Sequence, residues 1–298
     1  TQRHHTSRPT MASKAFPITL SCSGMMKGIQ HELPPKAVAL RVPAPPAALL
    51  DVAACNALPL ATSQLVQAVT LNSGLAAFGL VRGQRILTTS GLVHAWALGV
   101  LLWASLGWRG WGVCVIYLIG GSTVTKLGQA KKERLGIAEG RGGARGPENV
   151  WGSAATAAIC ALGARVMPAR AAAFRVGFAA SLATKLADTC ASEVGKAYGR
   201  TTYLITTLRQ VPAGTEGAVS AEGTAAGIVG SIVLAGLAVA VGLIPMVLLL
   251  PCVCAAFVAN NVESLIGASA QGQSGWGWLT NEMVNFINTA VGAVVALL

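Results

Sequence analysis

Long apolar runs, separated by short polar stretches, recur from residue 56 to the end of the chain, and they constrain the fold more than any other feature. Of the 298 residues, 53% are hydrophobic and only 11% are charged, whereas a soluble domain carries about 25% charged residues. A soluble core of this size would need a charged surface to enclose it, and the chain lacks that charge. The mean hydropathy is +0.58. The sequence therefore predicts an all-α, polytopic membrane protein.

We expect about seven to eight transmembrane helices joined by short polar loops, since a spanning helix needs about 20 residues and fewer where protein shelters it. The expected spans are residues 56–80, 90–107, 111–125, 150–166, 174–187, 223–242, 244–259 and 280–297. The third and fifth of these are short for a span. Gly and Ala supply much of the apolarity, and such small residues allow membrane helices to approach closely.

The first 50 residues differ in composition from the rest. They hold six Lys or Arg residues, one acidic residue (Glu32), several Ser and Thr residues and several prolines. A basic, Ser-bearing, acid-poor segment is typical of an organelle transit peptide. We therefore expect residues 1–52 to be a transit peptide, with a disordered tail as the alternative, and residues 53–298 to form one membrane-embedded domain.

The charges between the expected spans are distributed unequally between the two sides. Loops after the first, third, fifth and seventh spans carry twelve basic residues: Arg82, Arg85, Lys126, Lys131, Lys132, Arg134, Arg141, Arg145, Lys185, Lys196, Arg200 and Arg209. The other side carries four: Arg109, Arg165, Arg170 and Arg175. By the positive-inside rule the first side faces the cytosol or stroma. The three long polar loops, 126–149, 188–222 and 260–279, all fall on that side.

Composition also bears on two classes of partner. The net charge is +11, but the basic residues are dispersed among apolar segments instead of forming one face, so nucleic-acid binding is not indicated. The seven cysteines include no Cys-x-x-Cys pair and have no His partner at zinc-site spacing. They are interpreted as small apolar fillers in a reducing compartment.

The stretch 183–207 concentrates charge in this apolar chain. Asp188, Ser192, Gly195 and Gly199 fall at i, i+4, i+7 and i+11, which places them on one helical face. A carboxylate at a membrane helix end is costly unless it is paired or holds a cation, so it marks a functional site. The structural alternative is an ion pair between Asp188 and Lys185 that joins helices.

Two further segments also concentrate charged residues and glycines. The first holds three glycines within Gly140–Gly143 with basic residues on both sides, and it suits either an anion site or attraction to anionic lipid. No Walker motif occurs. Downstream, Glu222-Gly223-Thr224 opens the sixth span, where free N–H groups attract anions, although ordinary capping explains the same residues.

The third loop, like the second, places polar residues and glycine on one helical face. Asn260, Glu263, Ser264 and Gly267 share a helical face, and "NNVESLIG" aligns with "DTCASEVG", which hints at an internal repeat. His94 stands alone on an apolar helix and is expected to be a core histidine, with a catalytic role as the alternative. Acidic residues that hold Mg²⁺, together with basic residues that bind phosphates, are what phosphoryl transfer requires.

The pattern Asp188-x-x-Ala191-Ser192-x-x-Gly195-x-x-x-Gly199, followed by Glu222-Gly223-Thr224-x-Ala226-Gly227, resembles the paired motifs of CTP-dependent polyprenol kinases such as dolichol and phytol kinases. The longer blocks "RGPENVWGSAA", "TKLADTCASEVGKAYGRTTYLITT", "GTEGAVSAEGTAAG" and "WLTNEMVNFINT" are similar to the phytyl-phosphate kinases of plastid tocopherol (vitamin E) synthesis. These belong to a membrane family that also includes the animal transmembrane protein 19. The resemblance covers residues 70–298.

This resemblance implies a multi-pass kinase in the chloroplast envelope or thylakoid, with its active face toward the stroma. Its reaction would convert phytyl monophosphate to phytyl diphosphate with a nucleoside triphosphate, CTP by the motif. Mg²⁺ would be the metal, and the bilayer and a prenyl phosphate would be the partners. The alternatives are a kinase of free phytol or another polyprenol, a cytidylyltransferase, and a non-enzymatic transporter.

The residues implied by the motif match fall into three groups. The expected catalytic residues are Asp188, Glu222 and Lys185. The expected nucleotide- and phosphate-binding residues are Lys126, Arg145, Ser192, Gly195, Lys196, Gly199, Arg200 and Thr224. The expected metal ligands are Asp188, Glu222, Glu193 and Glu263.

Overall fold

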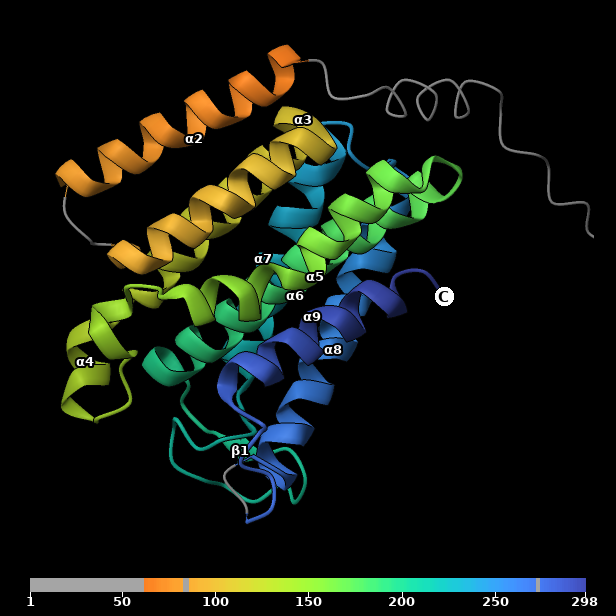
Figure 1. Ribbon diagram of the computed structural model, residues 1–298. Coiled ribbons are helices and arrows are strands. Elements are labelled where there is room, and N and C mark those ends of the chain that lie inside the picture. The colour runs from red at the N-terminus through yellow and green to blue at the C-terminus, as the bar shows by residue number, and fades with distance from the viewer. Residues whose placement is uncertain (1–61, 83–85, 272–273) are drawn as a thin grey trace, which may run out of the picture. The chain divides into compact units, whose positions relative to one another are not determined.

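The computed structural model describes residues 62–82, 86–271 and 274–298, and this part of the chain is almost entirely helical (Figure 1). The long helices are α2 (Thr62–Arg82), α3 (Thr89–Thr125), α5 (Pro147–Val166), α6 (Ala171–Tyr198), α7 (Ala221–Ala240), α8 (Leu249–Ser269) and α9 (Asn281–Val295). Between them lie the short elements α4 (Gln129–Arg134), η1 (Gly140–Gly143), η2 (Pro168–Arg170), β1 (Tyr203–Leu204), β2 (Ala218–Val219) and η3 (Met246–Leu248). The predicted all-α class is confirmed. The predicted transit peptide lies outside the described residues.

Helix α3 consists of two halves that fold back on each other. The backbone breaks at Gly107, which has φ 66° and ψ −163°, a left-handed φ that glycine adopts without steric cost. Arg145 contacts both halves: its carbonyl accepts a hydrogen bond from Thr88 N (3.0 Å), and its side chain donates to the Tyr117 hydroxyl (2.6 Å). In a straight helix these two residues would be more than about 40 Å apart. The two halves correspond to the separate spans expected at 90–107 and 111–125.

Side-chain caps fix where several helices begin. Thr88 accepts a hydrogen bond from Gly91 N (3.0 Å) at the start of α3, and Ser220 accepts one from Gly223 N (3.1 Å) at the start of α7. Thr280 caps α9 in the same way, through Met283 N at 3.3 Å. Each cap satisfies one of the free N–H groups at a helix start, which typically contributes about 1 kcal/mol. These caps place the ends of α7 and α9 at the site described below.

Helix α6 lies at the centre of the bundle, in contact with α3, α5, α7, α8 and α9. Every residue from Val176 to Cys190 is buried. The expected span ends at residue 187, whereas α6 continues for three more turns to Tyr198 and includes the helical face predicted for Asp188, Ser192 and Gly195. The extension is held from α4, where Lys131 Nζ donates to the Ala197 carbonyl (2.6 Å) and Lys132 pairs with Glu193. Helix α8 likewise continues to Ser269, ten residues beyond its predicted end at residue 259.

Helices α6 and α7 cross at a glycine-lined contact, which we call the α6–α7 seam; it comprises Gly195, Gly223, Gly227 and Gly230. A Cβ atom at Gly223 would lie 2.5 Å from the Ala191 carbonyl oxygen, and one at Gly230 would lie 2.9 Å from Cys190 Sγ. Both distances are too short for a side chain. Small residues therefore let the two backbones approach closely, as is common between helices in membranes.

Four stretches of the described residues are long and apolar enough to cross a membrane. They are Ser63–Val81, Thr89–Thr125, Ala221–Ala240 and Met246–Ser269. Among the remaining long helices, α9 has only 15 residues and α6 carries both signs of charge along its length. Burial within the bundle shelters α6, and a sheltered helix can be more polar than one that faces lipid.

The charged residues gather at two ends of the helices. At one end, Arg109 Nη1 reaches the Gly242 carbonyl (3.4 Å) and Arg165 Nη1 reaches the Ala104 carbonyl (3.3 Å). At the other end, the described residues of the polar segments 126–149, 199–220, 260–271 and 274–280 meet around the end of α6 and the start of α7. The prediction that the three long polar loops share one side therefore agrees with the structure.

We expect single cysteines at Arg134 and Thr207 to be labelled from the same compartment, and one at Arg170 from the opposite compartment. The measurement is thiol labelling with a membrane-impermeant reagent in sealed vesicles, after the native cysteines have been replaced by serine or alanine. Permeabilised vesicles, in which all three positions should react, serve as the control. Labelling of Arg134→Cys and Thr207→Cys from opposite sides would contradict the arrangement.

Candidate functional site

The polar end of the bundle encloses a cavity of about 410 Å³, which we call the carboxylate pocket. Elements far apart in sequence form its walls. They are the α6 residues Asp188, Ser192, Gly195 and Lys196, the start of α7 at Ser220, Gly223 and Thr224, and the α8 residues Asn260, Glu263, Ser264 and Gly267. Further lining comes from Gly136–Glu139 of the first polar loop, from Thr202 and residues 213–219 of the second, and from Asn281 and Asn285 of α9. The pocket thus combines all three polar loops singled out in the sequence.

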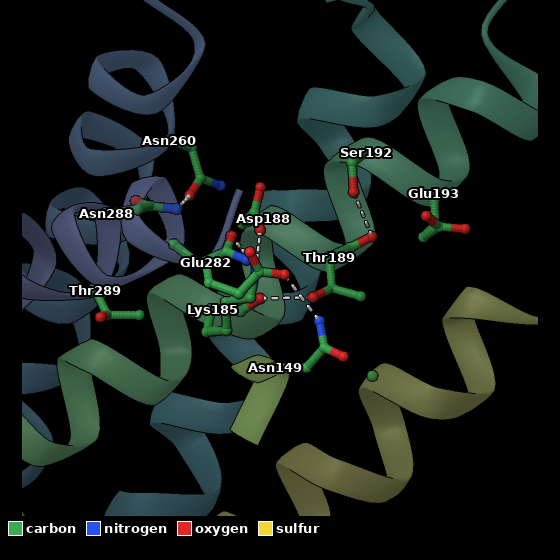
Figure 2. A network of polar contacts seen from close by, with 12 residues as sticks. Asn149, Lys185, Asp188, Thr189, Ser192, Glu193, Asn260, Glu282, Asn288 and Thr289 are labelled. Carbon is green, nitrogen blue, oxygen red and sulfur yellow. Dashed lines mark hydrogen bonds and ion pairs between the residues drawn. The ribbon is translucent and has the colours of Figure 1, made fainter. Parts of the chain in front are cut away.

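Asp188 lies at the centre of a polar network in this pocket (Figure 2). Lys185 Nζ, one turn earlier on α6, donates to the Asp188 carboxylate and to Asn285 Oδ1 of α9 at 2.6 Å. Glu263, from α8, lines the same pocket as Asp188. Two carboxyl groups in one pocket repel each other when both are ionised, and a cation or a shared proton relieves the repulsion. The ion pair named as the structural alternative is thus present, and it lies within a larger cluster.

The N-terminus of α7 faces the same pocket. Ser220 caps the helix and, with Gly223 and Thr224, lines the cavity. The loop before it is held by the antiparallel pairing of β1 with β2, in which Tyr203 lies opposite Val219. Free N–H groups at a helix start attract anions. The pocket therefore has the positive end of a helix dipole on one wall and carboxylates on another.

The predicted metal ligand Glu193 does not reach the carboxylate pocket. Its carboxylate pairs with Lys132 of α4 inside the protein and lies 3.5 Å from Lys196 Nζ. Figure 2 shows its side chain directed away from Asp188. Five residues along a helix correspond to a turn of about 140°, so the two carboxylates leave α6 on different sides. The grouping of Glu193 with Asp188 as joint ligands is therefore wrong.

Glu222 also lies outside the pocket lining. Its carboxylate accepts a hydrogen bond from the backbone N–H of Arg200 (3.4 Å), which ties the start of α7 to the end of α6. The side chain of Arg200 is exposed, and Gly199 packs against Ser220. Of the predicted site residues, the cavity brings together Asp188, Ser192, Gly195, Lys196, Thr224 and Glu263, with Lys185 directly behind Asp188.

The glycine-rich segment Gly140–Gly143 is likewise not part of the pocket. Arg141 donates to the Glu148 carboxylate and to Asn149 Oδ1 (2.9 Å) at the start of α5. The hydrogen bond from Arg141 lowers the pKa of Glu148 below its usual value. Arg145 and Lys126 also stand outside the carboxylate pocket. Lys126 is exposed at the end of α3, and Arg145 lines a second cavity treated below.

The pocket residues fit a magnesium ion that is completed by phosphate. Within the described residues no group of three or more His, Cys, Asp or Glu side chains could enclose a metal by itself. Mg²⁺ is usually bound through one or two carboxylates, with waters and substrate phosphates as the remaining ligands. Asp188 and Glu263 provide such a pair, and the Asn260 and Asn285 amides lie beside them.

Other sequence features find a place in the structure. The two segments suggested as a repeat, beginning at Asp188 and at Asn260, line the same pocket from α6 and α8. His94 Nδ1 accepts a hydrogen bond from Trp151 Nε1 at 2.9 Å, as expected of a core histidine. Sequence reasoning missed Lys132 as the partner of Glu193, and it missed Tyr117, which contacts Arg145.

Comparison with known proteins identifies the family. The model of the integral membrane protein family DUF92 matches residues 72–293. The membrane protein sll0875 of Synechocystis sp. is 54% identical over 233 residues, covering 78% of this chain and 90% of that protein. The chloroplastic protein VTE6 of Arabidopsis thaliana is 45% identical over 215 residues, covering 71% of this chain and 65% of VTE6.

A more distant relative is the membrane protein MJ0933 of Methanocaldococcus jannaschii, 29% identical over 221 residues that cover 74% of this chain and 88% of the relative. No solved structure matches the chain significantly. The membrane-family resemblance inferred from the motifs is confirmed. The chain belongs to the DUF92 family of integral membrane proteins.

Proposed function

We propose that this protein is a prenyl-phosphate kinase, which transfers a phosphoryl group from a nucleoside triphosphate to phytyl monophosphate. The observation that carries the proposal is the carboxylate pocket, where Asp188 and Glu263 stand beside the N-terminus of α7 and the cation of Lys196. Carboxylates for a metal and donors for phosphate oxygens are the parts that phosphoryl transfer needs. The similarity to chloroplastic VTE6 supports a chloroplast membrane as the location, and the excess of basic residues on the side of the pocket supports an orientation toward the stroma. Phytyl phosphate is the acceptor that the sequence resemblance implies.

Each wall of the pocket has a distinct role in this proposal. Asp188 and Glu263 would hold Mg²⁺, which when bound neutralises charge on the triphosphate. Ser220 and Thr224 line the pocket at the start of α7, where the helix dipole favours an anion, and their hydroxyls would donate to phosphate oxygens. Lys185 holds Asp188 in place through its ion pair and is itself fixed by Asn285. CTP is the donor suggested by the motif resemblance.

The acceptor suits the charge of this site. In the reaction a phosphate oxygen of phytyl monophosphate attacks the γ-phosphorus, the bond from that phosphorus to the β–γ bridging oxygen breaks, and the nucleoside diphosphate leaves. A phosphate monoester has a second pKa of about 6, so near neutral pH it needs no base to become a nucleophile. A free alcohol would need a positioned general base. The one histidine of the described helices, His94, is held by Trp151 instead.

We expect phytyl phosphate to be used far better than phytol, and the rate to fall as the pH drops below about 6, because the acceptor then gains a proton and loses nucleophilicity. The measurement is kcat/KM for both acceptors across pH, with purified protein in detergent, Mg²⁺ and each nucleoside triphosphate in turn. Equal or better use of phytol would replace this proposal with a phytol kinase. Release of pyrophosphate with transfer of the nucleotide would indicate a cytidylyltransferase.

A further inference from the structure

A second cavity, of about 630 Å³, lies between α2, α3 and α5. Its walls are mostly apolar and include Leu75, Phe78, Leu92, Leu98, Leu102 and Leu118. The volume falls in the range of about 300–1,000 Å³ that is typical of small-ligand pockets. Nothing in the phosphoryl-transfer chemistry described above uses this cavity.

The cavity is bordered on its outer side by α2, a helix with an exposed apolar surface. Leu75 and Phe78 line the cavity and are nevertheless 45% and 58% exposed. Leu65 and Val66 are also exposed on the same helix, which is one of those able to cross a membrane. An apolar exposed surface on a spanning helix faces lipid. The cavity therefore borders the hydrocarbon region of the bilayer.

The cavity is elongated along the first half of α3. Its lining extends from Leu87, just before this helix, to Leu102, which corresponds to about 22 Å at 1.5 Å per residue. The hydrocarbon core of a bilayer is about 30 Å thick, so one leaflet is about 15 Å deep. The lined stretch of α3 is therefore longer than one leaflet is deep, and a lipid chain can lie along it.

One end of the cavity is cationic. Arg145 lines it there, with Nη1 donating to the Tyr117 hydroxyl (2.6 Å) and the guanidinium over the Tyr117 ring. The Arg145 backbone is fixed by hydrogen bonds with Ile86 O and Thr88 N. Among the ion pairs of the described residues, none gives Arg145 a carboxylate partner. A half-buried guanidinium without a counter-charge favours an anionic ligand, and phosphate is a preferred one.

This cationic end lies next to the carboxylate pocket. A Cβ atom at Gly120, one turn after Tyr117 on α3, would lie 3.7 Å from the side chain of Leu186, the residue after Lys185 on α6. Asn149 also lines the cavity, and its Nδ2 donates to Glu282 Oε1 of α9 at 3.4 Å. Figure 2 shows Asn149 directed toward Glu282, beside Lys185. A phosphate held at Arg145 would thus lie at the border of the pocket proposed for the nucleotide.

We propose that this cavity is the acceptor site: it holds the isoprenoid chain of a prenyl monophosphate between α2, α3 and α5, with the phosphate on Arg145. The identity of the acceptor as a kinase substrate rests on the proposed function, whereas occupation of the cavity by a prenyl phosphate does not. The chain enters from the bilayer, and the nucleotide enters from the aqueous side. The two substrates therefore meet from different phases.

The test is equilibrium binding of radiolabelled phytyl phosphate to the purified protein in detergent, without nucleotide. Ala95→Phe fills the cavity from α3 and should weaken binding by about tenfold or more. Ala97→Phe, an equal change at an exposed position on the same helix, is the matched control and should bind as wild type. Ala76→Phe and Ala77→Phe form a second such pair on α2. Thermal unfolding checks that each variant is folded.

The role of Arg145 needs a separate comparison. Arg145→Gln should weaken binding of phytyl phosphate by about tenfold and leave binding of phytol almost unchanged, because only the phosphate contacts the guanidinium. Phosphatidylglycerol is tested as a competitor of the radiolabelled phytyl phosphate. If it displaces the label as effectively as unlabelled phytyl phosphate at the same concentration, the cavity binds bulk anionic lipid and the proposal is overturned.

The outcomes separate this proposal from the kinase assignment. Tight binding that Ala95→Phe and Ala76→Phe weaken, with no turnover of any nucleotide, would support the cavity and refute the kinase. If the protein turns over phytyl phosphate, and Ala95→Phe and Ala76→Phe both bind it as the wild type does, the kinase proposal is supported and the cavity is not the acceptor site. Absence of binding to the wild-type protein would also refute the cavity.

Discussion

Replacing Asp188 with asparagine should lower kcat with phytyl phosphate by a factor on the order of 10²–10³, the scale for one preorganised electrostatic group. Asparagine keeps the size of the side chain but removes its negative charge, so the site would lose the proposed metal ligand, and Lys185 would lose its counter-charge. The measurement is kcat of the purified variant at saturating acceptor and nucleotide, titrated with Mg²⁺. A raised Mg²⁺ requirement is expected in addition to the lower rate.

Glu148→Gln is the matched control for this variant. It also converts a carboxylate to an amide, but Glu148 is exposed and pairs with Arg141 outside the pocket. We expect near wild-type turnover for it. Near wild-type turnover of Asp188→Asn, with normal insertion and folding, would show that Asp188 serves only as a structural partner of Lys185.

Replacing Lys132 with methionine should lower the free energy of unfolding by about 3–5 kcal/mol, the usual cost of removing one partner of a buried ion pair. Lys132 is 0% exposed and Glu193 is 2% exposed. The Lys132 ammonium also donates to the Thr125 carbonyl at 2.6 Å. Without it, the Glu193 carboxylate stays inside the protein with only the weaker contact to Lys196. The measurement is unfolding in a denaturing detergent, monitored by circular dichroism.

The double variant Lys132→Met/Glu193→Leu distinguishes the pair from the packing around it. Removing both charges leaves no buried carboxylate, and exchange of a buried pair for apolar residues is often neutral or stabilising. We therefore expect the double variant to regain most of the lost stability. Equal instability of the single and double variants would mean that the Lys132 side chain stabilises through its bond to Thr125 and its packing, and not through Glu193.

The sequence predicted the helices and the polar side of the bundle because both depend on local patterns. Apolar runs indicated α7 and α8. Two spans were expected at 90–107 and 111–125, and the backbone of α3 breaks between them at Gly107, although the whole stretch Thr89–Thr125 is apolar. The shared face of Asp188, Ser192 and Gly195 followed from helical spacing and is present in the pocket. The expected span ends eleven residues before α6 does, because charged residues after 187 resemble a loop when their partners are unknown.

Long-range pairing was beyond sequence reasoning. Glu193 resembled a metal ligand until Lys132, 61 residues away, was found beside it. Glu222 matched a motif position, yet its side chain is occupied by the Arg200 backbone. Arg145 was predicted to bind phosphate, but the apolar cavity that ends on it is assembled from α2, α3 and α5 together. No local pattern encodes such a cavity.

The α6–α7 seam has a consequence for how distant relatives are recognised. A Cβ atom would overlap its neighbours at Gly223 and Gly230 and would be in tight contact at Gly227, so the same crossing favours small residues there, whatever reaction the protein supports. A search that relies on this glycine pattern would find proteins that share the helix crossing. Such proteins need not share a reaction, so the search would group proteins of different activity together. The carboxylates of Asp188 and Glu263 come from separate helices and have no part in the crossing. Under the kinase proposal, their joint presence is therefore the better criterion for sorting homologues by activity.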